Sequence, residues 1–161
     1  MSVTSVDKDL DHLTLTLIAD FAAPVERVWR LWADPRQLER WWGPPTYPAT
    51  VQEHDLSPGG EVAYFMTGPE GDRHRGWWRI TSVSEPTTLE FTDGFADDDG
   101  KPKDDMPTTS VRVRLSEHAG GTRMEMRSLF DSREQMEQMV AMGMEEGLTE
   151  AVAQIDALLA A

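Results

Sequence analysis

Hydrophobic and polar residues alternate over several stretches of this chain, and strict alternation predicts half-buried β-strands. The first stretch is 13–17, where leucine alternates with threonine. Four more candidate strands follow, at 50–56, 61–67, 74–83 and 88–93, and glycine- and proline-rich turns separate most of them. Apolar and polar residues alternate in 111–115 and 124–130, on either side of a Gly-Gly turn, which predicts a hairpin with one solvent-exposed face.

Helical spacing of apolar residues predicts two short helices after the first strand and one long helix at the end. Pro24 suits the first turn of a helix whose valines and tryptophans share one face. Asp34 can cap a second helix that has Pro35 at its first position. Residues 132–159 repeat apolar positions at helical spacing behind a Ser-x-x-Gln capping box.

These elements predict an α+β fold in which a curved antiparallel sheet bends around the long C-terminal helix. We expect one domain over residues 11–161 and a flexible tail over residues 1–10. Residues 94–107 are rich in Asp, Gly, Lys and Pro, which predicts a mobile loop. Gly143 and Gly147 interrupt the helical pattern, and we expect close backbone approach or cavity room there to offset their helix-weakening effect.

Composition excludes several classes of function. The 161 residues include no cysteine, so disulfides and thiolate chemistry are absent. A net charge of −14 disfavours nucleic acid and anionic membrane surfaces as partners. No apolar run approaches the ~20 residues that cross a bilayer, and the acidic start does not resemble a signal peptide. We therefore expect a cytoplasmic protein without membrane insertion.

Metal and cofactor sites are not predicted. The four histidines, His12, His54, His74 and His118, have no metal-ligand spacing. The acidic run 97–100 lacks the terminal glutamate of a calcium loop. We expect no structural metal and no cofactor.

Several motifs occur in an order that is typical of one family. They are Pro24 with Val28 and Trp32, Asp34-Pro35, Trp41-Trp42-Gly43-Pro44, Asp55-Leu56-Ser57-Pro58-Gly59-Gly60, Gly120 to Arg123, and Gly143 with Gly147. Together they resemble the Hsp90 ATPase activator homologue family, which is similar to the activator's C-terminal domain and belongs to the START-like helix-grip (SRPBCC) superfamily. Ser57 and Leu148 stand where the family usually has Arg and Trp.

The resemblance implies a ligand cavity between the sheet and the C-terminal helix. Matched helix and strand periodicities select residues that would line it. The expected lining is Trp41, Trp42, Tyr64, Trp78, Phe91, Val113, Met126, Met136, Val140, Met144, Leu148 and Val152. The four early tryptophans allow two interpretations, an aromatic lid or plain core, and core is favoured.

Three functions are compatible with such a fold. The preferred one is binding of an apolar or aromatic small molecule. The second is a cyclase- or hydrolase-like enzyme acting on a hydrophobic substrate, with proton-transfer groups drawn from His54, Tyr64, Arg75 and Asp93. The third is a chaperone-associated interaction module, although we expect no chaperone partner, because the eukaryotic activators carry a further domain. The sequence leaves a homodimer open.

Overall fold

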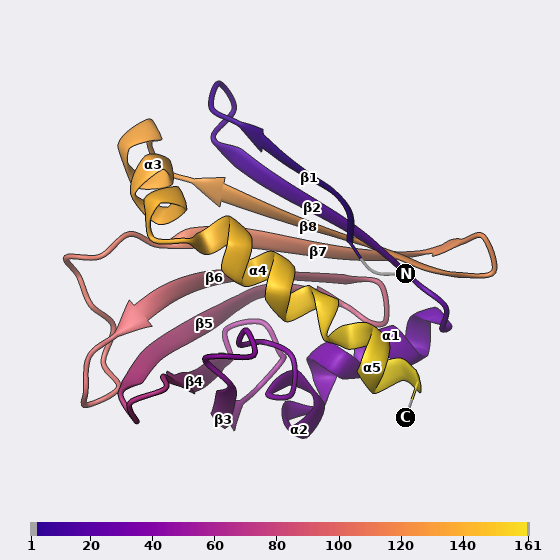
Figure 1. Cartoon of the computed structure of the whole chain (residues 1–161), viewed down its shortest axis with the longest axis horizontal. Coiled ribbons are helices and arrows are strands. Elements are labelled where there is room, and N and C mark those ends of the chain that lie inside the picture. The colour runs from indigo at the N-terminus through magenta and orange to yellow at the C-terminus, as the bar shows by residue number, and fades with distance from the viewer. Residues whose placement is uncertain (1–2, 161) are drawn as a thin grey trace.

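The computed structural model describes residues 3–160 and contains one antiparallel sheet (Figure 1). Its eight strands lie in the order β1-β2-β8-β7-β6-β5-β4-β3. Their bounds are β1 (Val3–Asp9), β2 (Thr14–Phe21), β3 (Ala49–His54), β4 (Glu61–Thr67), β5 (Arg73–Ser84), β6 (Thr88–Ala96), β7 (Thr109–His118) and β8 (Gly121–Phe130). The alternating stretches of the sequence all lie within or next to these strands.

Five helices lie against one face of the sheet. They are α1 (Val25–Ala33), α2 (Pro35–Leu38), α3 (Arg133–Ala141), α4 (Met144–Ala153) and α5 (Ile155–Ala160). Figure 1 shows α4 crossing the sheet obliquely, with α5 next to α1. A hydrogen bond from Arg27 Nη2 to the Leu158 carbonyl (3.2 Å) joins α1 to α5. The predicted α+β helix-grip architecture is therefore confirmed.

The N-terminal segment differs from the predicted flexible tail. Residues 3–9 form β1, an edge strand paired antiparallel with β2. Val3 and Val6 pack against the core, which supplies the apolar contact that the tail was not expected to make. The sequence pattern missed this strand because the burial is partial and its other residues are mostly exposed and polar. Residues 1 and 2 of the predicted tail lie outside the described part of the chain.

The segment predicted as a loop at 94–107 is ordered at its start. β6 continues to Ala96, and the Asp97 carboxylate accepts hydrogen bonds from the backbone N–H groups of Asp99 and Lys101, both at 2.9 Å. The Lys103 N–H donates to the Phe95 carbonyl at 2.8 Å. These contacts make residues 97–103 a closed turn that follows the end of β6.

The long C-terminal helix is broken, which the sequence pattern did not predict. Ser132 caps α3 as expected, because its hydroxyl accepts from the Gln135 N–H at 3.1 Å. The chain then leaves the helix at Met142 and re-enters it after Gly143, whose φ is +89°. Glycine adopts this left-handed conformation without the steric cost that other residues carry. The expectation of close backbone approach is wrong at Gly147, since a Cβ there would meet no atom within 4 Å.

The aromatic core fills one end of the layer between sheet and helices. Trp32 and Trp41 are fully buried with ring centroids 4.7 Å apart, and Trp41 Nε1 donates to the Leu31 carbonyl at 2.9 Å. Trp29 and Trp42 are also buried, so the core interpretation of the four early tryptophans is confirmed. None of the helices in the described residues has the length and apolar character that a membrane span requires.

Candidate functional site

One carboxyl group lies on the mostly apolar, helix-facing side of the sheet. Along β6, Leu89 and Phe91 are buried against the core, and Asp93 continues the same alternating face. In register, Asp93 lies between Trp78 on β5 and Thr109 on β7. The strand pairing therefore places a titratable side chain beside buried aromatic rings.

Tyr64 is the direct partner of this carboxyl. It comes from β4, and its hydroxyl donates to Asp93 Oδ1 at 3.0 Å. Burial raises the pKa of Asp93 to about 7, against the smaller lowering effects of the Tyr64 hydroxyl and the Gly94 N–H. Burial also raises the pKa of Tyr64, and the nearby Asp93 charge adds to that rise. Asp93 is packed among protein atoms yet keeps partial solvent contact, as a residue at the base of an opening does.

Tryptophans enclose the Tyr64 side of the pair. Trp78 stacks on Phe91 with centroids 4.0 Å apart, and Trp42 meets Trp78 edge-on at 4.8 Å. The indole N–H groups of Trp42 and Trp78 lower the Tyr64 pKa, so they lie near its hydroxyl. Neither is aligned for a hydrogen bond, and both remain without a partner among residues 3–160. Buried donors of this kind are uncommon in native proteins.

Two further polar residues extend the site across β7 and β8. Thr109 and Ser128 are 3% and 2% exposed on the helix-facing side of the sheet. Ser128 pairs with Val111, so it is diagonal to Thr109. Neither hydroxyl has a hydrogen-bond partner in the described part of the chain. Sequence reasoning did not select these residues, although Ser128 stood at an apolar position of the alternation between Met126 and Phe130.

The sheet-facing side of α4 is only partly buried. Met144 and Leu148 share the sheet-facing side of α4 with Ala151 and Val152, yet the first two keep partial solvent exposure and the last two are buried. The half-buried Met139 and Val140 of α3 behave like Met144. The sheet-facing side is thus sealed near α5 and accessible near the α3–α4 break. We call this part of the layer the open end. On the helix side it comprises Met139, Val140, Met144 and Leu148, which pack in part against Leu15, Phe130 and Met136. On the sheet side it comprises the half-buried Asp93 and the buried Thr109 and Ser128.

The structure brings together two of the four proposed proton-transfer residues. Tyr64 and Asp93 meet, whereas His54 and Arg75 lie elsewhere. His54 Nε2 is 2.9 Å from the Trp32 carbonyl oxygen, next to α1. Arg75 lies over the Phe65 ring on the opposite side of the sheet and donates to Gln52 at 3.1 Å. The orientation of Arg75 follows from alternation, since Phe65 and Arg75 are neighbours in register on that outer face.

The predicted cavity-lining residues occupy two environments. Those that are buried in the core or nearly so are Trp41, Trp42, Tyr64, Trp78, Phe91, Val113, Met126, Met136 and Val152. Those that keep partial exposure are Val140, Met144 and Leu148. Lining of a cavity by this set stays a prediction.

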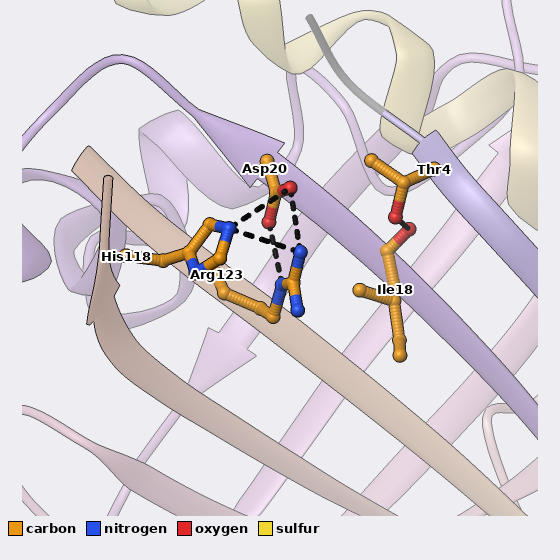
Figure 2. Close-up of polar contacts among 5 residues, drawn as sticks. All are labelled: Thr4, Ile18, Asp20, His118 and Arg123. Carbon is orange, nitrogen blue, oxygen red and sulfur yellow. Dashed lines mark hydrogen bonds and ion pairs between the residues drawn. The ribbon is translucent and has the colours of Figure 1, made fainter. Parts of the chain in front are cut away.

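A second polar cluster lies on the other side of the sheet and serves a structural role. Figure 2 shows Asp20 of β2 accepting from Arg123 Nε and Nη2 of β8 at 2.8 and 3.0 Å, with His118 beside them. The Arg123 hydrogen bonds lower the Asp20 pKa. A surface recess next to His118 is lined by the start of α1 and the β7–β8 turn, and its lining residues are mostly exposed. We place the candidate site at Tyr64–Asp93 instead, because a carboxyl held among buried rings is the more perturbed group.

Comparison with solved structures gives close relatives. A crystal structure of the Mycobacterium smegmatis protein Ms6760 is 54% identical, covers 98% of this chain and 96% of that one, and has a TM-score of 0.91. A solution structure of an Arthrobacter aurescens protein is 53% identical, covers 99% and 92%, and has a TM-score of 0.95. The AHSA1 protein of Silicibacter pomeroyi is 27% identical, covers 91% and 97%, and has a TM-score of 0.72.

A comparison with curated proteins gave no match. The family model described as "Activator of Hsp90 ATPase homolog 1-like protein" matches residues 22–160. This match spans every element from α1 to α5 and includes all the residues of the open end. The chain therefore belongs to the Hsp90 ATPase activator homologue 1-like family.

Proposed function

We propose that this chain is a cytoplasmic binding protein for a small apolar or aromatic molecule, held at the open end between the sheet and α3–α4. One observation supports this above the rest. Met144, at the start of α4, and Leu148, one turn further on, share the sheet-facing side of that helix with Ala151 and Val152. Ala151 and Val152 are buried, whereas Met144 and Leu148 keep partial solvent exposure. Apolar side chains that face inward and are only partly covered are characteristic of a binding surface.

The chemistry of the open end suits such a ligand. Methionine side chains adapt to irregular apolar shapes, and Met139 and Met144 both contribute to this surface. Each Å² of apolar surface removed from water contributes roughly 25 cal/mol to binding before entropy costs. The polar row of Asp93, Thr109 and Ser128 would orient the ligand, as a few polar groups do in mostly apolar sites.

A second candidate function is catalysis by proton transfer. The buried Tyr64–Asp93 pair favours it, because burial brings the pKa of Asp93 to about 7, where a general acid or base is most effective. The reaction would act on a hydrophobic substrate bound at the same open end. Binding is the preferred proposal, since it requires only the surface and not the alignment of a reacting bond with the Asp93 carboxyl.

The binding proposal is tested by a nuclear magnetic resonance titration with neutral aromatic fragments, for example 1-naphthaleneethanol. We expect shift changes confined to amides of α3, α4 and strands β6 to β8. Leu148→Trp fills the open end with a bulky ring and is expected to abolish these changes. Leu148→Met keeps the volume nearly constant and serves as the matched control.

Two results contradict the proposal. One is that none of the neutral aromatic fragments changes the amide chemical shifts of the open end. The other is binding that survives Leu148→Trp unchanged, which would place the site elsewhere. A circular dichroism melt of each variant establishes that the fold is kept.

A further inference from the structure

Asp93 has no positively charged partner among residues 3–160. Its side chain receives one hydrogen bond from Tyr64, and the Gly94 N–H assists. The half-buried Asp20, by contrast, pairs with Arg123 at 2.8 Å. Buried charges in proteins are generally paired.

The surroundings of Asp93 offer groups that recognise ammonium. The neighbouring Trp78 and Phe91 stack on each other and are fully buried, and Trp42 and Tyr64, each 8% exposed, complete the aromatic wall. Aromatic rings attract cations through their negative faces, and Trp42 and Tyr64 are the two rings of this wall that keep solvent contact. On the other side, Thr109 is the register partner of Asp93, and its hydroxyl can accept a hydrogen bond.

The net negative charge of the chain also favours a cationic ligand. The chain carries 29 acidic and 15 basic side chains, a formal net charge of −14. Such a field raises the local concentration of cations and lowers that of anions. An anionic head group would also meet the Asp93 carboxyl at the base of the open end, where repulsion is weakly screened.

We propose that the ligand is an aromatic or apolar amine, whose ammonium group binds between the Asp93 carboxylate and the Thr109 hydroxyl while its apolar part lies against Met144 and Leu148. This inference rests on the proposed binding function and names the ligand class. Ammonium has three N–H donors, and the Asp93 carboxylate and the Thr109 hydroxyl supply acceptors for it on adjacent strands. The missing counter-charge of Asp93 is thereby provided by the ligand.

Proton linkage gives an additional readout. Burial holds the Asp93 pKa at about 7, and a bound cation would lower it, so amine binding near pH 7 should release protons. Tyr64 is the titratable group that contacts Asp93 within residues 3–160; Trp78 and Thr109, its register neighbours on β5 and β7, do not titrate. Calorimetry in two buffers of different ionisation enthalpy measures the proton release.

The experiment compares three probes that share a naphthalene ring: the amine 2-(1-naphthyl)ethylamine, the alcohol 1-naphthaleneethanol and the carboxylate 1-naphthaleneacetate. We expect the amine to bind about tenfold or more tighter than the alcohol, and the carboxylate to bind weakest. Asp93→Asn should weaken the amine about tenfold and leave the alcohol within about twofold. Asp98→Asn removes the same charge from an exposed loop position and is the matched control.

The outcomes separate the two proposals. If alcohol and amine bind the open end equally, or if the amine keeps its affinity in Asp93→Asn, the amine inference is wrong and the binding function stands. If none of the probes changes the amide chemical shifts of the open end, both proposals are wrong.

Thr109→Val provides a second variant that does not depend on how Asp93→Asn folds. It should weaken binding of the amine about threefold without affecting binding of the alcohol. An unchanged amine affinity in Thr109→Val would remove the hydroxyl from the proposed site.

Discussion

The two ends of the layer between sheet and helix differ in how completely the helix covers the strands. Near α5, Trp32, Val152 and Ile155 are all fully buried in one aromatic and aliphatic core. Near the α3–α4 break, Met144 and Leu148 lie on the sheet-facing side of α4 and keep partial exposure. The sealed end carries the stability of the fold, and the open end keeps part of its apolar surface and the Asp93 side chain in contact with solvent. That division is typical of a binding protein, in which a rigid scaffold supports a less covered site.

Truncating a core residue of the sealed end should have the largest effect. Trp32 is 0% exposed and packs against four aromatic neighbours, so Trp32→Ala should lower the free energy of unfolding by about 4 kcal/mol. Met144→Ala at the open end should cost only about 1 kcal/mol, because water already reaches the side chain. Urea unfolding of both variants measures the difference. Equal losses would contradict the distinction between the two ends.

Neutralising Asp93 should stabilise the protein at high pH. Burial raises its pKa from 3.8 to about 7, so the folded state holds the proton more tightly than the unfolded chain does. The contribution of Asp93 to stability is therefore largest below pH 3.8. It falls as the pH rises from 3.8 to about 7, and it stays low above pH 7. Because Asp93 keeps some solvent contact, we expect a cost of about 2 kcal/mol rather than the full shift.

Asp93→Asn removes this cost. At pH 8 its free energy of unfolding should exceed that of the parent chain by about 2 kcal/mol, and the gain should vanish near pH 4. Urea unfolding of both proteins at several pH values checks the trend. A gain that is independent of pH would show that Asp93 is not the group responsible.

The sequence could predict half of this site. Strand alternation places Asp93 on the face of Leu89 and Phe91, as the structure does, although the sequence favoured a solvent-facing Asp93 side chain. Its contact with Tyr64 could not be predicted, because the two residues are 29 positions apart and meet through the register of three strands. Thr109 escaped notice for the same reason, since its position beside Asp93 depends on how β7 pairs with β6.

The C-terminal helix shows a different limit of sequence reasoning. Apolar spacing continues through Gly143, so periodicity predicted one helix over residues 132–159. The break depends on a backbone conformation, φ +89°, which glycine permits but does not require. The tertiary arrangement, with α3 against β8 and α4 against β1, favours this conformation. The open end follows from this break and could not be derived from periodicity.

Substituting the break glycine should have a moderate effect. Gly143→Ala places a Cβ at a φ of +89°, which L-residues adopt at a cost, and should destabilise the fold by about 1 kcal/mol. Thermal unfolding by circular dichroism measures this. If Gly143→Ala is neutral or stabilising, the chain can form a continuous helix here and the break is not essential to the fold.

Gly147→Ala should have the smallest effect, and it should stabilise the fold where Gly143→Ala destabilises it. Gly147 lies inside α4, and a Cβ there would meet no atom within 4 Å. Gly147→Ala should therefore stabilise the fold by about 0.5–1 kcal/mol through helix propensity alone. The same substitution should leave amine and alcohol probe affinities unchanged, because a single methyl group does not fill the space beside Leu148. A loss of probe binding without a loss of stability would instead place the ligand directly against Gly147, and would move the proposed site from the α3–α4 break toward the middle of α4.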